Sequence, residues 1–144
     1  MPEPRTLLAF DYGTSRIGVA TGQTATGSAS ALGELRARDG TPDWNDIKKL
    51  LDEWQPELVL VGLPLNMDGS DSDFAQRARK FANRLHGRFG VAIQMVDERL
   101  SSFEAKQEHR AAGGSGHYKS DPVDAIAARL ILETWFSERS TRSE

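Results

Sequence analysis

The chain has 144 residues, 38% of them hydrophobic, and it contains no cysteine. A chain of this length can close a single core without cross-links, and the lack of cysteine excludes disulfide frameworks and thiolate metal sites. The net charge of −3, from 18 basic and 21 acidic side chains, excludes binding of nucleic acid over a long basic footprint, so any such binding would need a local patch. No apolar run approaches the roughly 18 residues of a membrane helix, which predicts a soluble, cytoplasmic protein.

The first element is a buried strand over residues 7–10, because four apolar residues follow one another without a polar interruption. Asp11 lies at its end, and Gly13 permits a tight reversal into a hairpin partner over residues 17–20. A carboxylate at the exit of a buried strand costs stability unless a cation meets it. Asp11 is therefore the first candidate for a functional residue.

A third antiparallel strand is expected over Ser28–Arg38, followed by a turn at residues 39–43. Apolar residues at helical spacing predict a helix over residues 44–54, which ends near Pro56. A continuous apolar run at residues 58–62, which contains the β-branched Val59 and Val61, predicts the next strand. A polar loop at residues 64–72 then leads to a long helix whose apolar face comprises Phe74, Ala78, Phe81 and Leu85.

Residues 91–96 predict the last strand, and Asp97 and Glu98 stand at its exit. A capping box at residues 101–104 predicts a helix to about residue 112, and Asp121 with Pro122 is typical of the start of a final helix. We expect a flexible N-terminus over residues 1–6, one domain over residues 7–136 and a flexible tail over residues 137–144.

This order of elements predicts an α/β fold with a five-stranded mixed sheet in the order 3-2-1-4-5 and helices on both faces. The carboxyl ends of its parallel strands carry Asp11 and Glu98, and Asp124 lies in the first turn of the last helix. Three carboxylates that meet there need hard divalent cations, which points to Mg²⁺ or Mn²⁺, with two ions expected. Each acid alone has an ordinary structural explanation: a turn cap, a solvated strand exit, or a favourable charge at a helix N-terminus.

Four segments of the chain resemble the signature blocks of the YqgF family, the Holliday-junction-resolvase-like proteins also called RuvX. They are residues 11–20 (DYGTSRIGVA), 62–70 (GLPLNMDGS), 97–102 (DERLSS) and 124–128 (DAIAA). The resemblance implies an RNase H-like fold and a cytoplasmic, metal-dependent nuclease that trims the 5′ end of pre-16S rRNA. It also implies that Asp11, Glu98 and Asp124 are the catalytic, metal-binding carboxylates.

Four residues are candidates for contact with the substrate. Arg16 and Arg99 are placed to meet a phosphate near the metals, Lys119 lies in a loop with a neighbouring aromatic ring, and Asn66 follows a strand end. A basic stripe on the long helix is read more readily as a solvated face than as a phosphate track; it comprises Arg77, Lys80, Arg84 and Arg88.

Three alternatives stay open at this point. The run at residues 11–15 is also similar to the phosphate loop of actin-like ATPases, although no second copy of it follows. The domain could instead be a non-catalytic nucleic-acid-binding module. It could also resolve Holliday junctions or other branched DNA, which usually requires a dimer, whereas we expect a monomer or weak dimer acting on single-stranded or precursor rRNA.

Overall fold

The structure, a computed structural model, describes residues 5–98 and 123–142, and the side chains of residues 123, 124 and 139–142 lie outside that description. The strands are β1 (Thr6–Asp11), β2 (Arg16–Gln23), β3 (Ser28–Arg38), β4 (Thr41–Pro42), β5 (Leu58–Leu63) and β6 (Ile93–Asp97). The helices are α1 (Trp44–Trp54), α2 (Asp73–Phe89) and α4 (Val123–Arg142). None of the helices in the described part of the chain is long and apolar enough to cross a lipid bilayer.

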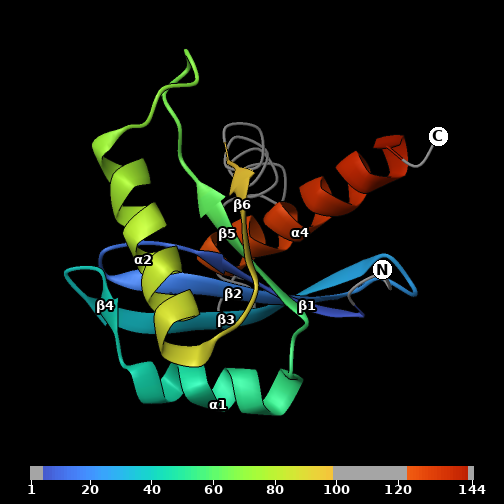
Figure 1. Ribbon diagram of the computed structural model, residues 1–144, viewed down its shortest axis with the longest axis horizontal. Helices are drawn as coiled ribbons and strands as arrows, with labels where there is room; N and C mark the ends of the chain where they lie inside the picture. Colours follow the sequence, from blue (N-terminus) through green and yellow to red (C-terminus); the bar gives the residue numbers. More distant parts are fainter. Residues whose placement is uncertain (1–4, 99–122, 143–144) are drawn as a thin grey trace.

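The strands form one mixed sheet in the order β4-β3-β2-β1-β5-β6 (Figure 1). The antiparallel meander of β1 to β3 and the parallel pairs β1–β5 and β5–β6 confirm the predicted topology. The predicted count of five strands was wrong by one. Thr41 and Pro42, read as part of a turn, pair with the end of β3 as the short edge strand β4, because the chain reverses through Asp39 and Gly40, both at positive φ.

Helices cover both faces of the sheet, as predicted (Figure 1). Side chains alternate along each strand, so β1 contributes Leu8 and Phe10 to a core with α1 and α2, and Leu7 and Ala9 to a core with α4. The ring of Phe10 meets that of Phe81 of α2 edge to face, with centroids 5.9 Å apart. The two cores therefore show on which face of the sheet the side chain of each strand-end residue lies.

The ends of the helices follow the sequence signals in part. The Ser72 hydroxyl accepts a hydrogen bond from the Ala75 N–H and caps α2, which ends at Gly90 in the left-handed conformation. Helix α4 continues to Arg142, so the domain boundary predicted at residue 136 falls inside this helix. The helix predicted from residue 101 and the cap predicted at Asp121 lie outside the described residues.

Candidate active site

Asp11 is the last residue of β1, at the carboxyl end of the parallel part of the sheet. Its neighbours Phe10 and Tyr12 both belong to the core with α1 and α2. Because side chains alternate along a strand, Asp11 faces the opposite side, the side covered by α4. It is half-buried and pairs with Gly18 of the hairpin partner, which adds no side chain on that face.

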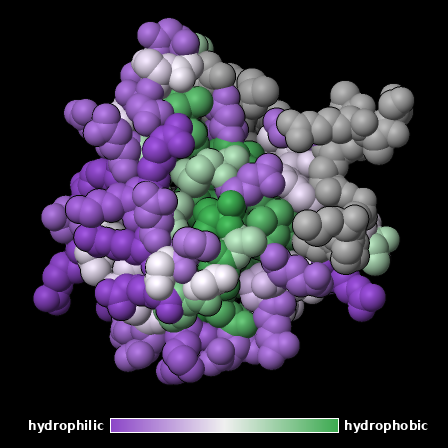
Figure 2. All heavy atoms as spheres, viewed as in Figure 1, coloured by the Kyte–Doolittle hydropathy of each residue, from purple (hydrophilic) through white to green (hydrophobic). Residues whose placement is uncertain are grey.

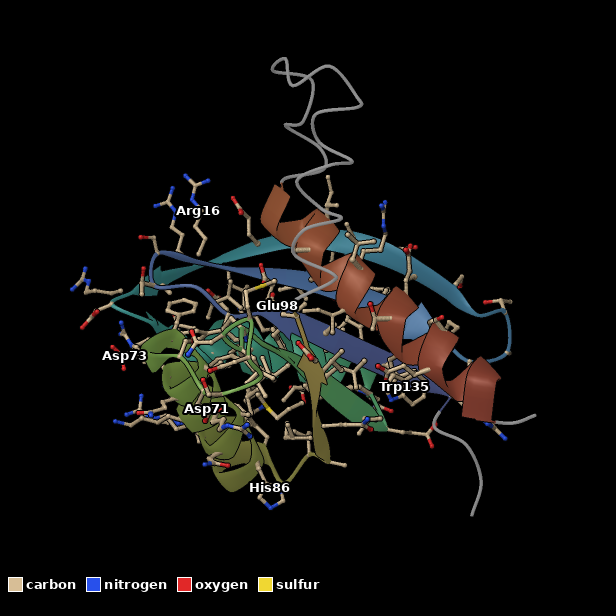
Figure 3. The ribbon with its side chains drawn as sticks, turned by 90° about the horizontal axis from the view of Figure 1, so that it is seen from above. Arg16, Asp71, Asp73, His86, Glu98 and Trp135 are labelled. Carbon is tan, nitrogen blue, oxygen red and sulfur yellow. The ribbon has the colours of Figure 1, made fainter. Side chains whose placement is uncertain are left out.

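Glu98 follows β6 and is buried, with 6% of its surface exposed. Its backbone N–H donates to the Leu63 carbonyl oxygen at 3.0 Å, so the ladder with β5 continues beyond the end of β6. Val96, two residues earlier, packs in the core with α4, which places Glu98 on the α4 side as well. Figure 3 shows Glu98 in the interior of the molecule.

Gly62 of β5 lies between these two acids. Its neighbour Val61 pairs with Phe10 on β1, and Gly62 itself pairs with Val96 on β6. A Cβ atom at Gly62 would lie 2.9 Å from both Cδ and Oε1 of Glu98, so the carboxylate rests directly against the glycine. The backbones of β1 and β6 are two strand spacings apart, about 9.5 Å. No side chain rises from the strand between them, and the space above Gly62 is taken by the Glu98 carboxylate and by Ile131 of α4.

The third predicted acid, Asp124, is the second residue of α4, and its side chain lies outside the described residues. One helical turn later, Ala128 is fully buried in the core with α4, which shows that this end of the helix packs against the sheet. Among the described side chains no group of three acidic or histidine residues is placed to hold a metal ion. The structure thus brings Asp11 and Glu98 to one face and edge, and the role of Asp124 stays a prediction.

Arg16 begins β2 at the same edge of the sheet as Asp11. Its side chain is 65% exposed and lies at the periphery of the molecule (Figure 3). Its guanidinium forms a salt bridge of 3.0 Å with Glu34. The phosphate contact predicted for Arg16 stays a prediction. The other predicted phosphate ligands, Arg99 and Lys119, lie outside the described residues.

Asn66 lies in the exposed loop between β5 and α2. Its amide nitrogen donates to the Ser70 hydroxyl at 3.1 Å and to the Asp71 carbonyl oxygen at 3.4 Å, so the side chain shapes the loop. Arg79 of α2 anchors the end of this loop with two hydrogen bonds to the Asp71 carboxylate, of 2.9 and 3.1 Å. These bonds lower the pKa of Asp71, so the Asp71 carboxylate stays charged. The substrate contact proposed for Asn66 stays a prediction.

Gly62 is not among the residues that the sequence predicts for the site, although the sequence contains a signal for it. A glycine within an otherwise apolar strand often marks a close approach of another group to the backbone. Here that group is the Glu98 carboxylate on one side and Ile131 of α4 on the other, 2.7 Å from a Cβ built at Gly62. Gly62 is therefore a positioning residue of the site.

The fold is similar to that of solved Holliday junction resolvases. RuvC of Thermus thermophilus, solved with a Holliday junction substrate, superposes with a TM-score of 0.59 at 15% identity and covers 94% of this chain and 96% of its own. The yeast mitochondrial Holliday junction resolvase Ydc2 superposes with a TM-score of 0.55 at 10% identity, over 95% of this chain and 80% of its own. At these identities the likeness concerns the fold.

Residues 5–138 match the family model of RuvX, described as Holliday junction resolvase, and the chain belongs to this family. A relative from Chromohalobacter salexigens, named "Putative pre-16S rRNA nuclease", is 60% identical over 93% of this chain and 90% of its own length. A relative of the same name from Edwardsiella ictaluri is 59% identical over 94% of this chain and 97% of its own length. The resemblance noted from the signature blocks is confirmed.

Proposed function

We propose that this protein is a metal-dependent nuclease of the cytoplasm that hydrolyses phosphodiester bonds at the 5′ end of pre-16S rRNA, as a monomer or weak dimer. The observation that carries the proposal is the placement of Glu98, buried against Gly62, on the same face and edge as Asp11. A buried carboxylate is costly unless a cation or hydrogen bonds meet it. The names of the close relatives support the substrate.

The donor set fits a hard divalent cation. Asp11 and Glu98 offer only carboxylate oxygens, and the chain has no cysteine, so Mg²⁺ or Mn²⁺ suits the site better than zinc. We propose that Asp11, Glu98 and Asp124 hold two such ions, which supply charge neutralisation and a nucleophile at neutral pH when bound.

The chain's own residues contribute rigidity and charge. Burial of Glu98 between β5, β6 and the α4 side leaves its carboxylate few rotamers, which fixes one wall of the site. Asp11, half-buried at the strand end, is accessible to a phosphodiester from the edge of the sheet. Arg16 at that edge is placed to balance the negative charge of a phosphate, and Arg99, Lys119 and Asn66 are further proposed contacts.

The test is a cleavage assay on three substrates side by side. They are an RNA that spans the 5′ processing site of pre-16S rRNA, an unrelated short single-stranded RNA, and a four-way DNA junction, each with Mn²⁺ or with EDTA. We expect Mn²⁺-dependent cleavage of the precursor RNA that leaves a 5′-phosphate and a 3′-hydroxyl. Cleavage of the junction alone would favour the resolvase alternative. The absence of cleavage of all three would favour a non-catalytic binding module.

A further inference from the structure

A second polar site lies on the other face of the sheet, between α2 and the turn that joins β3 to β4. It is a pocket of about 280 Å³, below the usual range for pockets that enclose apolar small molecules. Its lining comprises Tyr12, Asp39, Gly40, Thr41, Arg77, Lys80, Phe81 and Arg84. The surface over α2 and β4 in Figure 2 is largely hydrophilic, in keeping with this lining.

Three cations of α2 enter the pocket at successive turns, at i, i+3 and i+7. Arg77 is held in place by hydrogen bonds to the Asp39 carbonyl oxygen at 2.8 Å and to the Asp39 carboxylate at 3.0 Å. Lys80 and Arg84 are exposed, and neither forms a salt bridge with any other residue in the described ranges. With one acid against three bases, the pocket has an excess of two positive charges on a chain whose net charge is −3.

The back of the pocket is preformed. The Tyr12 hydroxyl lies so close to Gly40 that a Cβ atom there would collide with it, and the Gly40 N–H donates to the Thr14 carbonyl oxygen at 2.8 Å. Tyr12 also packs on Phe81 of α2, with ring centroids 5.2 Å apart. An excess of cations around a rigid, polar cavity is the composition of a phosphate site, because it neutralises charge at little cost in ordering.

Tyr12 connects this pocket to the candidate active site. It follows Asp11 directly, and strand alternation directs the two side chains to opposite faces at one edge of the sheet. We propose that the pocket binds a backbone phosphate of a single-stranded nucleic acid whose neighbouring nucleotides pass over this edge to the carboxylates. The inference rests on the proposed function and names a further substrate contact for it. A pocket of this size encloses one phosphate and its sugar. Its cations recognise the charge of the phosphate and do not contact the bases.

The test compares Lys80→Gln/Arg84→Gln with Lys48→Gln/Lys49→Gln. The control pair lies on the exposed side of α1 and changes the net charge equally. Binding of fluorescein-labelled 12-mer RNA and DNA of one sequence is measured by anisotropy in EDTA over a range of salt concentrations. We expect the pocket variant to bind both strands about fivefold more weakly than the control, with a salt slope smaller by about 0.7 to 1, the loss of one phosphate contact.

Equal binding by the two variants, with wild-type binding intact, would overturn the pocket assignment and leave the proposed nuclease function untouched. Thermal melts of both variants establish that each is folded. A second measurement with inorganic pyrophosphate tests whether the pocket binds a free anion instead of a nucleic-acid strand. If the pocket variant lost pyrophosphate binding but bound RNA as the wild type does, the proposal would also be overturned. A wild-type protein that neither binds nor cleaves RNA would instead remove the proposed function, and this inference with it.

Discussion

Asp11→Asn is expected to lower the rate of Mn²⁺-dependent RNA cleavage at least a hundredfold. The amide keeps the shape of the side chain but removes the charge that a divalent cation requires, and even the loss of an outer partner of a metal ligand typically costs about 10- to 100-fold. In the proposed site the two carboxylates share a cation, and without it their like charges repel each other. The thermal midpoint of the metal-free variant should therefore be equal to that of the wild type or higher.

The matched control for this prediction is Asp73→Asn. Asp73 is an exposed carboxylate in the first turn of α2, and Figure 3 shows it at the periphery of the molecule. The control should cleave RNA at the wild-type rate. If Asp11→Asn cleaved as fast as Asp73→Asn, Asp11 would have no part in catalysis.

Gly62→Ala is expected to damage both stability and activity. The new methyl group would lie 2.7 Å from Ile131 Cδ1 and 2.9 Å from the Glu98 carboxylate, both too short for carbon contacts. Overpacking of a core in this way costs roughly 1–3 kcal/mol of unfolding free energy. Because the carboxylate must also move, we expect cleavage to fall at least tenfold at a temperature where the variant is fully folded.

Two further variants separate these effects. Gly87→Ala meets no atom within 4 Å and lies inside α2, so it should raise stability by up to about 1 kcal/mol and leave cleavage unchanged. Adding Ile131→Val to Gly62→Ala removes the Cδ1 atom of the first collision but not the collision with Glu98. That double variant should recover part of the lost stability without recovering activity. Wild-type cleavage by Gly62→Ala would show that the position of Glu98 is not set by this contact.

The continuous apolar strands and the spacing of the helical residues were enough to predict the sheet order and the two helical layers. This worked because a buried strand such as residues 58–62 is a short, continuous apolar run, and an amphipathic helix such as Trp44–Trp54 repeats its apolar residues at helical spacing. The short strand β4 was not predicted, because Thr41 and Pro42 follow a turn and have no periodicity of their own. It exists through pairing with Ala37 and Arg38, which is a tertiary effect.

The candidate site was predictable to the extent that it follows from strand ends. Asp11 and Glu98 could be placed at one edge from the chain order alone, since parallel strands end together. The contact between the Glu98 carboxylate and Gly62 depends on the register of β5 and β6, which the sequence pattern does not fix. The phosphate pocket depends on the Asp39 turn folding against Arg77, a contact across 38 positions of sequence. From the sequence alone its bases formed only a stripe along a helix.

The most direct test of the account is Mn²⁺ binding measured by isothermal titration calorimetry on the wild-type protein, Asp11→Asn and Glu98→Gln, with Asp73→Asn as the reference. We expect saturable binding by the wild type and the reference. We expect affinities at least tenfold weaker in both site variants, because each loses a charged ligand of the same cation. Unchanged Mn²⁺ affinity in both site variants would show that these two carboxylates do not share a metal.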